Sequence, residues 1–145
     1  VSLVIANRPD AAGLAWAKEQ GLPTLLIDHK QFSDRLSFEQ ALLEALDREK
    51  IELVVLAGFM RLLSAEFVAR FPKRIINIHP SLLPAYKGLD THKRVLEAGD
   101  KYHGCTVHIV TEALDDGPIL AQSKLEVYAG DTPESLAERL LPLEH

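Results

Sequence analysis

Short apolar segments alternate with amphipathic segments along the whole chain, and this alternation constrains the fold more than any other feature. Segments rich in Val, Ile and Leu are predicted as strands over 1–7, 23–28, 51–57, 74–79, 104–110 and 119–127. Helices are predicted over 11–20, 37–50, 64–71 and 91–98, and a last helix begins at Thr132-Pro133. The pattern is typical of an α/β fold with a Rossmann-like open, mostly parallel sheet and helices on both faces. Only the turn region 111–118 joins the last two strands, which predicts that these two run antiparallel.

Short polar side chains mark where the predicted helices begin. Asp10 is a candidate N-cap for the helix over 11–20, and Thr91 is one for the helix over 91–98. Ser37 and Gln40 form a capping-box pattern at the start of the helix over 37–50. Each cap is therefore expected to bond the first free backbone N–H groups of its helix.

The composition restricts the class of protein. At 145 residues the chain has the length of one domain, and a content of 47% hydrophobic residues excludes a disordered chain. No apolar run approaches the roughly 18 residues of a membrane-spanning helix, so no membrane partner is expected. The net charge of −5 argues against a nucleic-acid partner. The single cysteine excludes an internal disulfide and suits a reducing compartment, so a cytoplasmic protein is expected.

Several common kinds of site lack the residues they need. The eight glycines are too far apart for a phosphate-binding G-x-G-x-x-G motif or a P-loop. The six histidines and one cysteine show no metal-ligand spacing, and no metal is expected. Cys105 lies in an apolar predicted strand and is interpreted as buried and inert. Dinucleotide, phosphotransfer and metal chemistry are therefore not indicated.

Asn77 and His79 are the first residues that indicate a catalytic site. They lie two apart at the end of a predicted strand, so both side chains share one face and project into the crevice where α/β sheets bind ligands. A carboxamide donates to a developing oxyanion, and a histidine moves protons near neutral pH. An aspartate beside the ring would orient it, and Asp115 and Asp116 in the turn 111–118 are both candidates. Taken alone, the pair also fits a structural asparagine and a loop histidine.

The surrounding sequence resembles a known signature. Residues 77–84, Asn-Ile-His-Pro-Ser-Leu-Leu-Pro, are similar to the motif of the folate-dependent formyltransferases, and residues 114–118 resemble their aspartate turn. The segments 56–61, 86–92, 97–100 and 103–108 extend the resemblance to one family, the phosphoribosylglycinamide formyltransferases. This resemblance runs in register from residue 1 to residue 145.

The resemblance implies a reaction and three catalytic residues. The family transfers a formyl group from 10-formyltetrahydrofolate, its co-substrate, to the amine of 5′-phosphoribosylglycinamide in de novo purine synthesis. By this resemblance, Asn77 and protonated His79 would stabilise the tetrahedral oxyanion, and Asp115 would hold His79 while it donates the proton. Both substrates are small molecules, and a monomer or a homodimer is expected.

The resemblance also implies two sets of binding residues. The folate would be bound by Arg35, Met60, Arg61, Leu62, Leu63, Asn77, Val110, Thr111 and Leu114. The ribonucleotide would be bound by Gly58, Pro80 and Glu144. From residue type alone, Met60 would instead be a core residue, and Arg35 and Arg61 would be ordinary surface arginines.

The extent of the chain leaves alternatives open. The family's first strand and its phosphate-binding loop have no counterpart before Val1, so residues 1–145 are expected to form a single formyltransferase domain truncated at both ends. One alternative is another enzyme of the superfamily, either a methionyl-tRNA formyltransferase or a formyltetrahydrofolate deformylase. The other is a fragment that binds folate without catalysis.

Overall fold

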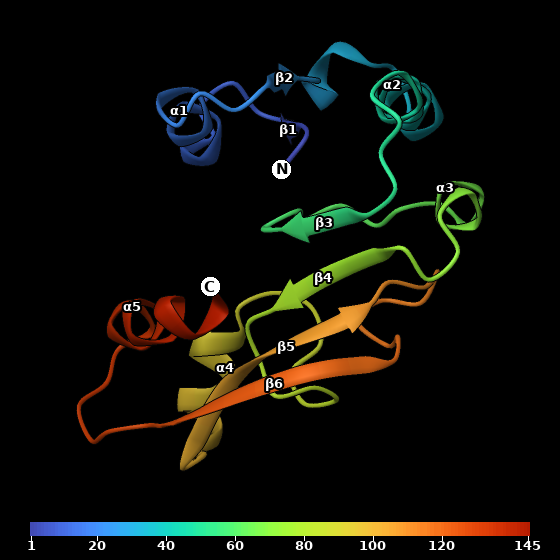
Figure 1. Ribbon diagram of the computed structural model, residues 1–145. Coiled ribbons are helices and arrows are strands. Elements are labelled where there is room, and N and C mark those ends of the chain that lie inside the picture. The colour runs from blue at the N-terminus through green and yellow to red at the C-terminus, as the bar shows by residue number, and fades with distance from the viewer. The chain divides into compact units, whose positions relative to one another are not determined.

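The computed structural model describes every residue from 1 to 145 and contains two compact units, Val1–Glu52 and Leu53–His145 (Figure 1). The first unit has two parallel strands, β1 (Val4–Ala6) and β2 (Thr24–Leu26), in which Val4 lies opposite Thr24. Its helices are α1 (Ala12–Glu19), the 3-10 helix η1 (His29–Gln31) and α2 (Arg35–Arg48). The core of this unit is formed by buried apolar side chains, chiefly Leu14, Ala17, Phe38, Leu42 and Leu46.

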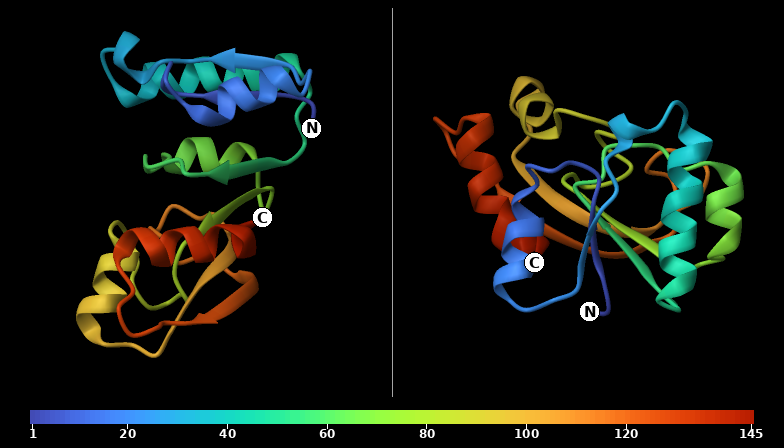
Figure 2. Two further views of the ribbon diagram at one scale, coloured as in Figure 1. Left: turned by 90° about the vertical axis from the view of Figure 1, so that its left-hand side faces the viewer. Right: turned by 90° about the horizontal axis from the view of Figure 1, so that it is seen from above.

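The second unit holds the remaining elements. In chain order they are β3 (Val54–Ala57), α3 (Ala65–Arg70), β4 (Ile75–His79), α4 (Thr91–Ala98), β5 (Tyr102–Ile109), β6 (Ile119–Glu126) and α5 (Pro133–Glu144). The four strands form one sheet in the order β3-β4-β5-β6. Helix α5 packs against α4 and against β5, as two views show (Figure 2). The core includes Phe67, Ile75, Val95, Leu136 and Leu140, and each is at most 2% exposed.

The α/β class and the antiparallel pairing of the last two strands are confirmed. Strand β3 pairs with β4 in parallel, but β5 already runs antiparallel to β4, with His79 opposite Thr106. The sequence did not predict this second antiparallel pairing, because the connection from β4 to β5 contains α4 and has the length of a parallel crossover. The loop after β5 therefore begins beside the start of β4, where Val110 N–H donates to the Ile75 carbonyl at 2.8 Å.

Three predicted helix caps were wrong. Asp10 pairs with Arg8 at 2.8 Å instead of capping α1, whose N-cap is Ala11. Helix α2 begins earlier than expected, because the Asp34 carboxylate accepts from Ser37 N–H at 2.7 Å and draws Ser37 into the first turn. Helix α4 has Asp90 at its N-cap, with a left-handed φ of 56° and no side-chain cap, and Thr91 is its first residue.

The predicted start of α5 is confirmed. Thr132 is the N-cap, Pro133 follows at the first turn, and Thr132 and Ser135 form a reciprocal capping box. No helix in the chain is both long enough and apolar enough to cross a membrane.

Candidate active site

Strand β4 presents Asn77 and His79 on one face of the sheet of the second unit. The antiparallel register sets His108 opposite Asn77 and Thr106 opposite His79, and residues directly opposite share a face. His79, Thr106 and His108 are buried, and Asn77 is half-buried. Four polar side chains therefore line a single patch on the sheet, where burial requires that each finds a partner.

Thr106 anchors the loop that follows His79. Its hydroxyl donates to the Ser81 carbonyl at 2.7 Å and accepts from Leu83 N–H at 3.1 Å. Gln122 on β6 binds the same hydroxyl at 3.0 Å and the Leu83 carbonyl at 2.9 Å. These bonds fix the start of the loop over 80–90 against two strands.

His79 lies between a backbone carbonyl and a carboxylate. Its Nε2 is 2.9 Å from the carbonyl oxygen of Tyr86, and its Nδ1 is 3.5 Å from Oδ2 of Asp115. Because a carbonyl oxygen only accepts, Nε2 is assigned the N–H of this hydrogen bond. Nδ1 then faces Asp115 at a distance longer than a normal hydrogen bond. Nδ1 is therefore the ring nitrogen that can exchange a proton with a neighbouring group.

Asp115, and not Asp116, is the aspartate at the histidine. The Asp115 side chain is 7% exposed, has a left-handed backbone φ of 47° and accepts from Gly88 N–H at 2.8 Å. Asp116 is 59% exposed and pairs with Lys87, which lowers the pKa of its carboxyl. The loop over 111–118 leaves the sheet at the start of β4, so Asp115 reaches His79 and His108 by folding back across the sheet face. Asp115 and His79 therefore lie close together, as expected, although the loop that carries Asp115 does not leave the sheet where β4 ends.

His108 is a site residue that sequence reasoning missed. Its Nδ1–H donates to the Ile109 carbonyl at 3.1 Å, which leaves Nε2 as an acceptor. Nε2 lies 3.4 Å from the amide nitrogen of Asn77 and 3.9 Å from Oδ1 of Asp115. This contact directs the Asn77 amide nitrogen toward His108 on the neighbouring strand. The sequence does place Thr106 and His108 on one face of a strand. Only the register between β4 and β5 shows that this is the face of Asn77 and His79.

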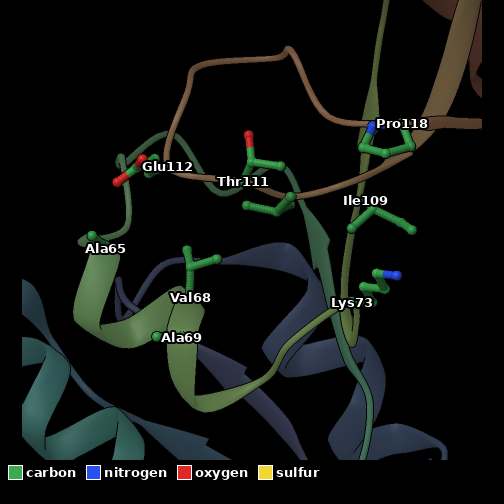
Figure 3. Close-up of a pocket in the computed structure, with 9 residues that line it drawn as sticks. Ala65, Val68, Ala69, Lys73, Ile109, Thr111, Glu112 and Pro118 are labelled. Carbon is green, nitrogen blue, oxygen red and sulfur yellow. The ribbon is translucent and has the colours of Figure 1, made fainter.

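An apolar pocket of about 340 Å³ lies between α3 and the loop after β5 (Figure 3). Figure 3 shows Val68 and Ala69 of α3 on one side and Ile109 with Thr111 on the other. Val110 and Thr111, two predicted folate residues, line this pocket, and Val68 was not predicted. The walls suit a flat ring system, because they offer aliphatic side chains and the polar groups of a loop backbone.

The other predicted folate residues of this unit lie on two loops. Residues 58–63 follow β3, where Leu63 is buried, whereas Met60 and Leu62 are 74% and 48% exposed. The residue-type interpretation of Met60 as core is therefore wrong. Arg61 is exposed, and Leu114 is 53% exposed in the loop before Asp115.

The predicted ribonucleotide residues lie on three elements of the same unit. Gly58 follows β3 with a left-handed φ of 68°, and Pro80 follows His79 directly. Glu144 ends α5, and burial raises the pKa of its carboxyl, while the charges of His145 and His79 act in the opposite direction. Arg35 begins α2 in the first unit, and its role stays a prediction.

The Cys105 thiol and the possible metal ligands are the last groups to consider. Cys105 is 3% exposed, and burial raises the pKa of its thiol, which keeps it protonated near neutral pH. No group of three or more His, Cys, Asp or Glu side chains converges so that it could hold a metal ion.

Comparison with known proteins adds three findings. The family model described as formyl transferase matches residues 1–145. The chain is 48% identical to the chicken (Gallus gallus) trifunctional purine biosynthetic protein adenosine-3, of which it spans 14%. It is 43% identical to the phosphoribosylglycinamide formyltransferase of Escherichia coli K12, of which it spans 68%. Both alignments cover 100% of this chain.

A solved structure shares the fold. The crystal structure of glycinamide ribonucleotide transformylase 1 from Symbiobacterium toebii matches with a TM-score of 0.96 and 46% identity. The match covers 99% of this chain and 68% of that chain.

Proposed function

The chain belongs to the formyl transferase family, and from this membership we propose that it transfers a formyl group from 10-formyltetrahydrofolate to the amine of 5′-phosphoribosylglycinamide. The observation that carries the proposal is the cluster of Asn77, His79 and Asp115, in which His79 faces Asp115 at 3.5 Å and His108 contacts both Asn77 and Asp115. A proton donor, an amide donor and a carboxylate on one sheet face are the groups that acyl transfer requires. We further propose that residues 1–145 belong to one formyltransferase domain, because one family model matches all of them.

The pocket is the proposed site for the ring system of the folate. Its lining by Val68, Ile109 and Thr111 supports this assignment, since a planar heteroaromatic ring buries its faces on aliphatic groups and bonds backbone groups at its edge. The predicted residues Met60, Arg61, Leu62, Leu63, Val110 and Leu114 would complete this site through the loops that carry them. Arg35 is proposed to bind the acidic tail of the folate.

The formyl donor supplies the carbon that the substrate amine attacks, and the chain's own residues handle the charge and the proton. Negative charge develops on the formyl oxygen, and the Asn77 amide N–H, oriented by His108, donates to it. As the bond between the folate nitrogen and the formyl carbon breaks, His79 donates its Nδ1 proton to that nitrogen, because Nε2 is engaged by the Tyr86 carbonyl. The imidazole then takes up the proton that the attacking amine loses. Asp115 stabilises the imidazolium from 3.5 Å while Gly88 N–H holds the carboxylate in place.

The ribonucleotide is proposed to lie toward Gly58, Pro80 and Glu144. Glu144 supports this placement as a carboxylate at the end of α5, which would bind the substrate amine or its hydroxyl groups. The left-handed Gly58 permits close approach of a ligand to the backbone, since it carries no Cβ.

The test is an acceptor comparison with the purified protein. Loss of 10-formyltetrahydrofolate is followed spectroscopically with phosphoribosylglycinamide, with charged initiator methionyl-tRNA, and with water alone. The proposal predicts turnover only with the ribonucleotide. Equal turnover in water would identify a deformylase, turnover with the tRNA alone would identify the tRNA enzyme, and folate binding without turnover would identify a binding protein.

A further inference from the structure

The loop over 84–90 carries backbone groups that contact both members of the His79–Asp115 pair. The Tyr86 carbonyl binds Nε2 of His79, and Gly88 N–H binds Oδ2 of Asp115. The conformation of this loop therefore sets the tautomer of the histidine and the position of the carboxylate together.

This loop adopts a conformation that its own residues disfavour. Tyr86, Gly88 and Asp90 have left-handed φ values of 55°, 85° and 56°. Only the glycine accepts such a φ without steric cost, and a left-handed residue with a side chain persists where surrounding contacts fix it. The loop consequently needs an external clamp.

Arg94 supplies contacts of this kind. It lies on the second turn of α4, and side chains on a helix lean toward its N-terminus, here toward the loop. Its Nη1 donates to the carbonyls of Lys87 at 2.6 Å and of Leu89 at 3.0 Å. Its guanidinium also lies over the Tyr86 ring, 5.3 Å from the centroid. One side chain thus contacts three residues of the strained turn, Tyr86, Lys87 and Leu89.

The other side-chain contacts of the loop do not bind the carbonyls of Lys87 and Leu89. Lys87 pairs with Asp116, but these side chains are 37% and 59% exposed, and solvent screens such pairs. The Tyr86 hydroxyl donates to Asp100 at 2.5 Å, which fixes the end of the ring and no backbone group. Buried Ser81 donates its hydroxyl to the Ala85 carbonyl at 2.6 Å, at the start of the loop, and Arg94 is the side chain that binds the carbonyls of Lys87 and Leu89.

We propose that Arg94 is a positioning residue for catalysis, which sets the proton-donating geometry of His79 by clamping the turn that carries the Tyr86 carbonyl and Gly88 N–H. This inference rests on the proposed function of His79 and Asp115. It assigns Arg94 no contact with either substrate. Loss of the clamp should lower kcat and change the tautomer of His79, and it should leave KM for both substrates nearly unchanged.

The decisive experiment compares Arg94→Gln with the matched control Lys93→Gln. Lys93 is the preceding residue of α4, is 65% exposed, and pairs only with Glu97 at 3.7 Å. Long-range proton–nitrogen NMR of the imidazole rings reports which nitrogen of His79 carries hydrogen, and a His79→Gln variant assigns its signals. In the parent protein we expect protonated Nε2. In Arg94→Gln we expect the Nε2 signal to move toward the average of the two tautomers and kcat to fall about tenfold.

Three results would contradict the proposed role of Arg94. Parent-like His79 signals and kcat in Arg94→Gln, or the same changes in Lys93→Gln, would overturn the proposal, as would a loss of kcat with unchanged His79 signals. If Arg94→Gln does not fold, the same measurements on Arg94→Lys decide whether the proposal holds. Lysine keeps the charge and at most one carbonyl contact. Failure of the proposed function is distinguishable, because normal turnover by His79→Gln would refute it whatever the NMR signals of the Arg94 variants.

Discussion

Nδ1 of His79 lies 3.5 Å from Oδ2 of Asp115, and only 7% of each side chain is exposed. The separation exceeds a normal hydrogen bond, and the nearest donor to the carboxylate is Gly88 N–H at 2.8 Å. The backbone therefore positions Asp115, and the histidine keeps an Nδ1 that is near a negative charge without being tied to it. Such an arrangement leaves Nδ1 free to exchange a proton with a bound group.

Replacing Asp115 tests this arrangement. Asp115→Asn retains an acceptor oxygen for Gly88 N–H, and asparagine tolerates the left-handed backbone, so the loop should persist. Because the negative charge is lost, kcat should fall by on the order of 10² to 10⁴ while the dissociation constant of the folate changes little. Steady-state kinetics and folate titration measure both values.

The neighbouring aspartate is the control. Asp116→Asn breaks only an exposed ion pair with Lys87, which solvent screens. Turnover of this variant should stay within a few-fold of the parent. If the two variants behaved alike, the assignment of the role to Asp115 would be wrong.

Asn77 is expected to act on the formyl oxygen. Its amide nitrogen is directed by His108 at 3.4 Å, so removal of the amide in Asn77→Ala should lower kcat by on the order of 10² or more. Asn77→Asp keeps the shape and replaces the amide donor with an acceptor, and it should be at least as impaired. Stopped-flow single-turnover rates distinguish this from slower product release. Parent-like rates in both variants would give Asn77 a structural role.

The pocket beside α3 is expected to bind the folate ring. Val68→Trp places an indole in a cavity of about 340 Å³, so the folate dissociation constant should rise tenfold or more, which corresponds to about 1.4 kcal/mol. Glu66→Trp, at an exposed position of the same helix, should bind folate normally. Equilibrium titration with a reduced folate makes the comparison. Unchanged affinity in Val68→Trp would place the ring elsewhere.

His103 predicts an acid-sensitive fold. It is 1% exposed, its Nε2 lies 2.9 Å from Nδ1 of His92, and burial, with a smaller effect of His92, lowers the pKa of His103 to about 4. The unfolded chain binds this proton near its usual pKa of about 6.5. Stability is therefore fully present above about pH 6.5 and falls as the pH approaches 4, where the folded state also takes up the proton.

Urea unfolding across this range measures the effect. The free energy of unfolding should fall by up to about 3 kcal/mol between pH 7 and pH 4, in addition to the contribution of other groups. His103→Gln removes the titrating group and should show a shallower decline. An identical pH dependence in both proteins would contradict the assignment to His103.

The sequence predicted the site's main residues but not how they meet. Asn77 and His79 share a face because a strand repeats every two residues, and this needs no tertiary information. Residue types alone left Asp115 and Asp116 as alternatives, and only the family resemblance favoured Asp115. The two adjacent aspartates differ in backbone φ and in partners, which residue types do not contain. His108 was missed because its partner, Asn77, is set by the antiparallel register of β4 and β5.

The exposure of Met60 and the first residue of α2 were also not predicted from the sequence. A methionine such as Met60 is usually core, and only the loop after β3 places it in solvent. Asp34 and Ser37 compete as caps for the same helix, and the carboxylate that reaches the Ser37 N–H determines the start. Both outcomes depend on local geometry that a pattern of residue types does not contain.

We propose that the cluster around His79 performs formyl transfer to the ribonucleotide. The most direct test is the single-turnover rate of His79→Ala against the parent protein, with 10-formyltetrahydrofolate and phosphoribosylglycinamide both saturating and folate affinity measured in parallel. We expect the transfer rate to fall by on the order of 10² to 10⁴ while folate affinity stays near the parent value. Transfer at the parent rate by His79→Ala would contradict it.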